Sequence, residues 1–287
     1  MSRPRSAVLS PRTLGTRRAR CTTQARGKAA SLRRTRKSSV ATHLAAALGI
    51  RGWRVLVVDM DSQASTTSML LDEVDDESPT TAQLLLGEAR MEDIIRPANR
   101  DGLFVAPAAS DLTQAQFAIA GKTGRETILR RAMRDVDGFD VVLIDTAPEL
   151  QLATLNALVA ASHVLMPFTP DPKALEGLET TSQAVAEIAA AELARPAILG
   201  CLQVAYDRRL AVTEQSREQV AAAYGPQLLA TRIRANSGFI VCPAWHRDIF
   251  AMERADRGKS RGSDDYLSLA DEVSARLGLA QPHAEAA

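Results

Sequence analysis

The 287-residue sequence has few of the features that mark several large protein classes. No apolar run approaches the roughly 18 residues that a membrane-spanning helix needs, so we expect no membrane segment. The three cysteines and four histidines show no metal-type spacing, and the cysteines are typical of reduced thiols in a cytoplasmic protein. Hydrophobic residues at 46% and charged residues at 24% indicate an ordinary soluble globular chain.

Acidic residues are absent from the first fifth of the chain. Residues 1–58 hold twelve arginines, two lysines and no aspartate or glutamate, although the whole chain carries a net charge of only +1. Residues 1–36 also lack helical or strand periodicity, and we expect a disordered basic segment there. Three interpretations are open: a nucleic-acid-binding arm, an organelle transit peptide, or a stretch that is not a selected sequence.

Helix and strand patterns alternate after this segment. The alternation predicts an α/β fold with a mostly parallel sheet and helices on both faces, in one domain over residues 37–280. Residues 281–287 are expected to form a flexible tail. The predicted strands are 53–61, 102–108, 139–148, 163–170, 197–206 and 228–233. The predicted helices are 38–52, 79–97 (several short ones), 111–136, 151–161, 173–194, 211–224 and 264–277.

A lysine and two hydroxyl residues stand where the first long helix begins. Lys37, Ser38 and Ser39 would lie at the helix N-terminus, where backbone N–H groups and the helix dipole favour phosphate. A lysine can reach phosphate oxygens, and a hydroxyl can hold Mg²⁺. Such a short string also occurs by chance, so it does not identify a phosphate site alone.

Aspartates follow two of the predicted strands. Asp59 and Asp61 end the strand over 53–61, and Asp145 lies near the end of the strand over 139–148. Ligands of parallel sheets bind at the carboxyl ends of strands, so these carboxylates could lie beside a bound Mg²⁺. Each could equally cap a turn. The order of the lysine, the two serines and the aspartates along the chain is what predicts a nucleotide site.

The same residues carry a resemblance to a known family. Residues 37–278 resemble the ParA family of partition ATPases, a group with a deviant Walker motif that is related to the MinD proteins. Two stretches are specific, "KSSVATHLAAALGIRGWRVLVVDMDSQAS" and "FDVVLIDTAPELQLATLNALVAASHVLMPFTPDPKALEGL". Residues 198–215, 231–250 and 261–273 resemble the family less specifically. The resemblance implies a P-loop NTPase fold of the deviant Walker type, with ATP and Mg²⁺ as cofactors.

The resemblance also implies roles for individual residues. Lys37 would contact the phosphates during catalysis, Ser38 would ligate Mg²⁺ and Ser39 would support the inner phosphates. Asp61 would orient or activate the attacking water. Its 24-residue separation from the lysine suits the family.

The two remaining acidic residues are implied to serve the metal. Asp59 would lie in the Mg²⁺ shell and Asp145 would reach the metal through water. Residues 146–148 would form the loop that senses the γ-phosphate. Gln63 keeps the family's glutamine, whereas Ser62 replaces its proline.

The match breaks just before the lysine. Where the family has Lys-Gly-Gly-Val-Gly, this chain reads "LRRTR" over residues 32–36, so three arginines replace the glycines and Leu32 replaces the signature lysine. Glycines there admit backbone angles that cost other residues about 1–3 kcal/mol each, and they leave room for phosphate. We also find no preceding apolar strand, so we expect the first strand of the sheet to be missing.

Three explanations of this break are open. The gene could be read in the wrong frame before residue 36, since shifted GC-rich DNA encodes much Arg, Ala, Ser and Pro. The protein could be a degenerate, non-catalytic relative that serves as a DNA-binding or interaction protein. The arginines could also form a working variant of the site, or a real basic arm.

The function that the resemblance implies is plasmid or chromosome partitioning by an ATP-dependent dimer switch on non-specific DNA. The partners would be a ParB-like centromere-binding protein, DNA and a second copy of the chain in the ATP-bound homodimer. Arg232 and Arg234 are the candidate DNA-binding residues, although ordinary surface ion pairs are the alternative. The terminal helix is acidic, which argues against membrane attachment, and the expected location is cytoplasmic and nucleoid-associated. An amide-forming ATP-dependent ligase on a similar fold is a third possibility, without an identifiable substrate pocket.

Overall fold

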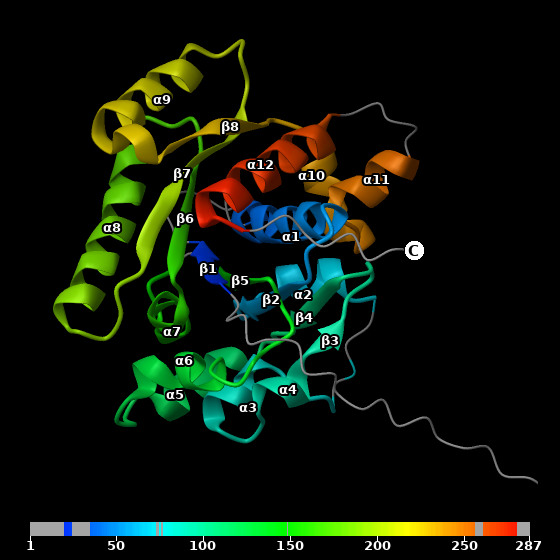
Figure 1. The fold of residues 1–287 in the computed structure, drawn as a ribbon, viewed down its shortest axis with the longest axis vertical. Helices are drawn as coiled ribbons and strands as arrows, with labels where there is room; N and C mark the ends of the chain where they lie inside the picture. Colours follow the sequence, from blue (N-terminus) through cyan, green and yellow to red (C-terminus); the bar gives the residue numbers. More distant parts are fainter. Residues whose placement is uncertain are drawn as a thin grey trace, which may run out of the picture.

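An eight-stranded sheet runs through the centre of the protein in the order β3-β4-β2-β5-β1-β6-β7-β8 (Figure 1). The computed structural model describes residues 20–24, 35–72, 75, 77–147, 149–255 and 261–279. Within this part every strand pair is parallel except β3 with β4. The strands are β1 (Arg20–Gln24), β2 (Val55–Met60), β3 (Arg96–Pro97), β4 (Leu103–Ala106), β5 (Val141–Thr146), β6 (His163–Phe168), β7 (Ala197–Tyr206) and β8 (Leu228–Arg234).

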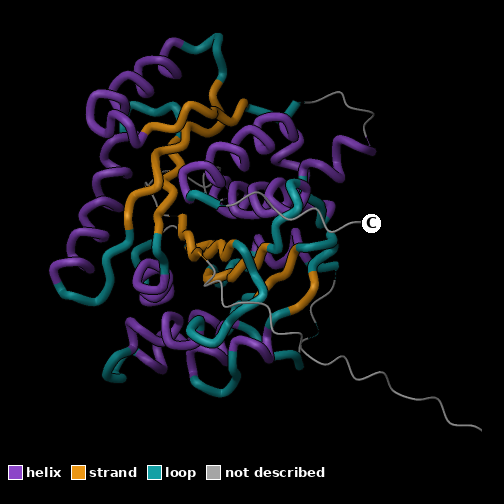
Figure 2. The backbone as a smooth tube through the Cα atoms, in the orientation of Figure 1, coloured by secondary structure: helices purple, strands orange, loops and turns teal. Residues whose placement is uncertain are grey.

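Helices cover both faces of this sheet, as Figures 1 and 2 show. Side chains alternate along β2: Val55 and Val57 pack with α1 and α12, while Leu56 and Val58 pack with α3, α5 and α7. The predicted α/β fold is therefore confirmed. The helices are α1 (Thr35–Ile50), α2 (Ser65–Leu70), α3 (Thr81–Leu86), α4 (Met91–Ile94), α5 (Leu112–Ile119), α6 (Ile128–Ala132), α7 (Leu152–Ala160), α8 (Ala174–Ala190), α9 (Ala211–Tyr224), α10 (Gly238–Val241), α11 (Ile249–Ala255) and α12 (Gly262–Leu277).

The strand β1 corrects the expectation that the first strand is missing. Residues 20–24 pair with β5 on one side and with β6 on the other, at the centre of the sheet. Ladder hydrogen bonds join backbone groups, so the polar sequence RCTTQ can fill this position without an apolar pattern. The expectation of disorder over residues 1–36 is likewise wrong for residues 20–24 and for Thr35 and Arg36, which begin α1. Residues 1–19, 25–34 and 281–287 lie outside the described part.

The strand–helix order places a phosphate-loop position between β1 and α1. In the β1–β5 register Thr23 is opposite Ile144, so β1 ends beside Asp145 at the carboxyl edge of the sheet. The chain then re-enters the described part as α1. The connection over residues 25–34 contains Arg33 and Arg34, two of the three arginines that replace the family's glycines, and it lies outside the described residues. The third, Arg36, lies in the first turn of α1.

Candidate nucleotide site

The first turn of α1 brings two serine side chains to the carboxyl edge of the sheet. Ser38 is 2% exposed and Ser39 is 5% exposed, and the alanine-rich sequence that follows them favours a helix. Lys37 lies in the same turn, and its side chain falls outside the described part. The helix begins at Thr35, three residues before the predicted start at residue 38, and the lysine and both serines lie within its first five residues.

The aspartates predicted from the strand ends meet at this edge. Asp59 and Asp145 are directly opposite each other in the β2–β5 register, and both are fully buried. Asp61 follows β2 and is 7% exposed; its backbone N–H donates to Oδ1 of Asp59 at 3.0 Å. Oδ1 of Asp61 in turn accepts a hydrogen bond from the backbone of Gln63. The structure therefore gathers the three acidic residues that sequence reasoning selected.

Two threonines that sequence reasoning missed hold these carboxylates in place. The hydroxyl of Thr66 donates to Oδ2 of Asp145 at 2.7 Å and lies 3.4 Å from the backbone oxygen of Ser38. Thr67 donates to Oδ2 of Asp59 through its hydroxyl, at 2.7 Å, and through its backbone N–H, at 2.9 Å. The signal for them was the run "STTS" over residues 65–68, which begins four residues after Asp61.

Burial and a neighbouring carboxylate make the charged form of Asp59 less favourable. Burial raises the pKa of Asp59 to about 7, and the negative charge of Asp145 adds to the shift. Hydrogen bonds from Thr67 and from the Asp61 backbone act in the opposite direction. Two buried acids that disfavour each other's charge are the arrangement that a bound cation relieves.

The donor set fits a magnesium ion held together with a nucleotide. Mg²⁺ is usually bound by one or two carboxylates, hydroxyls, water and substrate phosphates rather than by an all-protein cage. Asp59, Asp145 and Ser38 supply this kind of ligand set. The described residues contain no group of three or more His, Cys, Asp or Glu side chains that could hold a metal without such help.

The two candidate DNA-binding arginines lie on β8 and are ion-paired. Arg232 donates to both carboxylate oxygens of Glu214 at 2.5 and 3.1 Å. Arg234 binds the carboxylate of Asp265, with Nη2 2.6 Å from Oδ1. The predicted alternative, ordinary ion pairs, therefore describes these arginines in the isolated chain.

Comparison with known proteins decides the family. Residues 35–196 match a family model described as an AAA domain. The chain is 36% identical to the chromosome-partitioning ATPase Soj of Thermus thermophilus over 84% of its own length and 91% of that protein. It is 31% identical to the chromosome partitioning protein ParA of Myxococcus xanthus, over 84% of each chain. This chain belongs to the ParA family of ATPases.

A solved structure of a differently named enzyme shares the fold of this ParA-family chain. Cobyrinic acid a,c-diamide synthase from Mycobacterium smegmatis, crystallised with an ATP analogue and magnesium, superimposes with a TM-score of 0.74 at 29% identity. That comparison covers 88% of this chain and 93% of the synthase. Among the described helices of this ParA-family chain, none is both long and apolar enough to cross a membrane.

Proposed function

We propose that this protein is a Mg²⁺-dependent ATPase that partitions plasmid or chromosome DNA in the cytoplasm. The observation that carries the proposal is the buried pair Asp59 and Asp145 at the carboxyl edge of the sheet, beside Ser38 on the first turn of α1. Its curated relatives include proteins named for chromosome partitioning. Supporting the cofactor assignment, the related diamide synthase was solved with an ATP analogue and magnesium.

The chain's own residues suit phosphoryl transfer to water. Such transfer depends on positioning and charge neutralisation, which a bound Mg²⁺ would supply in part. Ser38 and Ser39 would hold the phosphate end of the nucleotide, together with Lys37. Asp61 would orient the attacking water, because its carboxylate is fixed by the Gln63 backbone and lies at the same edge as Asp59.

Replacing Asp61 tests this assignment. We expect Asp61→Ala to lower the Mg²⁺-dependent rate of ATP hydrolysis by about 10²–10⁴-fold, the usual contribution of a positioned acid or base. The measurement is phosphate release at saturating ATP. The matched control is Asp135→Ala, which removes an exposed carboxylate from the loop after α6. Equal rates in the two variants would contradict the proposed role of Asp61.

Three further parts of the proposal concern partners. We infer that the ATP-bound chain forms a homodimer, binds DNA without sequence preference through Arg232 and Arg234, and responds to a ParB-like protein. The parallel strand β8 ends at the same edge of the sheet as the acidic pair, which brings Arg234 toward the nucleotide end of the molecule.

The alternative is a non-catalytic relative that keeps the fold. The observation that favours it is the sequence "LRRTR" over residues 32–36, since three arginines stand where the family has glycines. A chain of this kind would retain DNA without ATP and would hydrolyse none. Phosphate release by the unchanged protein therefore separates the two functions. Amide formation by a ligase would additionally require an acceptor substrate.

A further inference from the structure

The phenol of Tyr266 reaches the first turn of α1 from the other end of the chain. Tyr266 is 1% exposed, and its hydroxyl shares a hydrogen bond with the hydroxyl of Ser39. Burial raises the pKa of Tyr266, so the phenol remains protonated at neutral pH. Ser39 is the residue that the proposed function assigns to the inner phosphates. A side chain of α12 therefore contacts the candidate nucleotide site.

Aromatic packing fixes the orientation of this phenol. His43 lies one helical turn after Ser39 on the same face of α1, and its ring meets that of Tyr266 edge-on at 5.1 Å between centroids. Phe239 meets Tyr266 in a T-shaped contact at 5.5 Å and His43 at 5.3 Å. Three mutually packed rings leave Tyr266 little rotamer freedom, so its hydroxyl has one defined direction.

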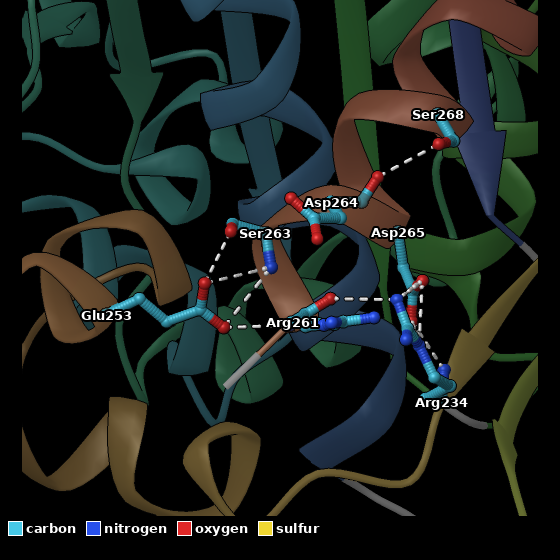
Figure 3. Close-up of polar contacts among 8 residues, drawn as sticks. Arg234, Glu253, Arg261, Ser263, Asp264, Asp265 and Ser268 are labelled. Carbon is cyan, nitrogen blue, oxygen red and sulfur yellow. Dashed lines mark hydrogen bonds and ion pairs between the residues drawn. The ribbon is translucent and has the colours of Figure 1, made fainter. Parts of the chain in front are cut away.

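The residue next to Tyr266 holds the candidate DNA-binding arginine. The carboxylate of Asp265 accepts hydrogen bonds from the Arg234 backbone N–H at 2.9 Å and from its guanidinium Nη2 at 2.6 Å and Nε at 2.9 Å (Figure 3). The same guanidinium donates to the backbone oxygen of Arg261 at 3.2 Å. One turn of α12 thus contacts Ser39 through one residue and Arg234 through the preceding residue.

The start of α12 is itself anchored. Oε1 of Glu253 on α11 accepts the backbone N–H of Gly262 at 2.7 Å, and its other oxygen accepts the Ser263 hydroxyl (Figure 3). A Cβ on Gly262 would lie 2.8 Å from both the Asn236 amide nitrogen and the Phe239 ring, so the turn packs closely against the segment after β8. The start of α12 is therefore held both by α11 and by the segment after β8.

We propose that Tyr266 is a positioning residue for Ser39, and that the Asp265–Tyr266 turn couples nucleotide binding to the Arg234 surface. The coupling rests on the proposed function, because it assumes that Ser39 meets a nucleotide and Arg234 meets DNA. Binding at one end would bias the turn toward the arrangement that favours binding at the other. Such coupling is reciprocal, so DNA should strengthen nucleotide binding by the factor by which nucleotide strengthens DNA binding.

The test is a titration of the full chain with a non-hydrolysable ATP analogue and Mg²⁺, with and without duplex DNA. Tyr266→Phe removes only the hydroxyl and keeps the packed rings. We expect this variant to bind the analogue about threefold to tenfold more weakly, as for loss of one hydrogen bond. We also expect DNA to change its analogue affinity much less than in the unchanged protein. Tyr224→Phe is the matched control, because it removes a tyrosine hydroxyl that is bonded to Ser182 at 3.0 Å between α9 and α8.

Each outcome decides the inference. The inference would be overturned if Tyr266→Phe bound the analogue as tightly as the unchanged protein. It would also be overturned if the variant bound more weakly but DNA still changed its analogue affinity by the same factor as in the unchanged protein. Unfolding midpoints of each variant, measured beside the titration, show whether the variant is folded. An equal loss of analogue affinity in Tyr224→Phe would also overturn the inference. Failure of the unchanged protein to bind the analogue would overturn the proposed function together with this inference. Failure of Tyr266→Phe to differ would overturn the inference alone.

Discussion

The acidic side chains of the candidate site depend on the hydroxyl groups around them. Thr67 gives Asp59 two hydrogen bonds, and its own hydroxyl accepts the backbone N–H of Ala108 at 2.9 Å. Thr66 joins Asp145 to the α1 backbone. These contacts orient the carboxylates before any cation binds. They do not remove the cost of burying two acids side by side, which the raised pKa of Asp59 expresses.

This cost predicts how stability depends on pH. The Asp59 carboxyl has a pKa of about 7 in the folded protein against a usual 3.8, so between these values the folded chain holds a proton that the unfolded chain has released. Without Mg²⁺, we therefore expect the free energy of unfolding to fall as pH rises from about 4 to about 7, by at most about 4 kcal/mol from this group.

The measurement is the difference between urea-unfolding free energies of the unchanged protein and Asp59→Asn across that range. The variant should lose this part of the pH dependence, because its amide does not titrate. Asp135→Asn serves as a control on an exposed carboxyl group. Identical pH dependence in the unchanged protein and in Asp59→Asn would show that Asp59 ionises normally.

Among the elements, β7 and β8 pack unusually closely at one glycine. The β6–β7 and β7–β8 registers shift along β7, and Gly200 lies in this strand. A Cβ built on Gly200 would clash with the Leu229 side chain and lie 2.5 Å from the backbone oxygen of Gln227. The strand β8 carries Arg232 and Arg234, so its place beside β7 sets the position of the candidate DNA surface.

Gly200→Ala should therefore destabilise the protein. We expect a loss of about 1–3 kcal/mol in the free energy of unfolding, the usual cost of forcing a methyl group into a packed interior. Chemical denaturation measures it. Gly121→Ala is the control, since a Cβ there meets no atom within 4 Å. Equal free energies of unfolding in the two variants would mean that β8 can shift to accommodate the methyl group without a loss of stability.

Over the whole molecule, the parallel strands bring distant parts of the sequence to one edge. Asp145 at the end of β5 and Arg234 at the end of β8 lie at the same edge, because β5, β1, β6, β7 and β8 run in one direction. The arginines there are already satisfied by Glu214 and Asp265. DNA phosphates would have to replace these carboxylates or share the guanidinium groups with them.

The DNA surface is tested by salt dependence. We expect Arg232→Ala with Arg234→Ala to weaken retention on non-specific DNA and to reduce the slope of log K against log salt by about 2, about one per lost phosphate contact. Arg51→Ala is the control, because Arg51 is also ion-paired, with Asp271 at 2.6 Å, at the far end of α1. Unchanged retention and slope in the double variant would exclude these arginines from the DNA surface.

Local sequence patterns were sufficient to predict most of the helices and strands. The strand predicted over 197–206 and the helix predicted over 211–224 coincide with β7 and α9, because each pattern is long and regular. The central strand β1 was not predicted, since its sequence is polar and only its two neighbours make it a strand. The short helices α10 and α11 were missed as well, because they have too few residues to show a period.

The sequence by itself determined the α/β class and the acidic residues at the strand ends, because these follow from local periodicity and from residue order. The family came from the resemblance of two long stretches to the ParA ATPases. The sequence also determined that arginines occupy the family's glycine positions. Only the tertiary structure decided that Thr66 and Thr67 hold the carboxylates and that the candidate DNA-binding arginines are paired. It also decided that Tyr266 meets Ser39. These contacts join segments that are far apart along the chain, and no local pattern specifies which of many buried hydroxyl groups will meet once the sheet has formed.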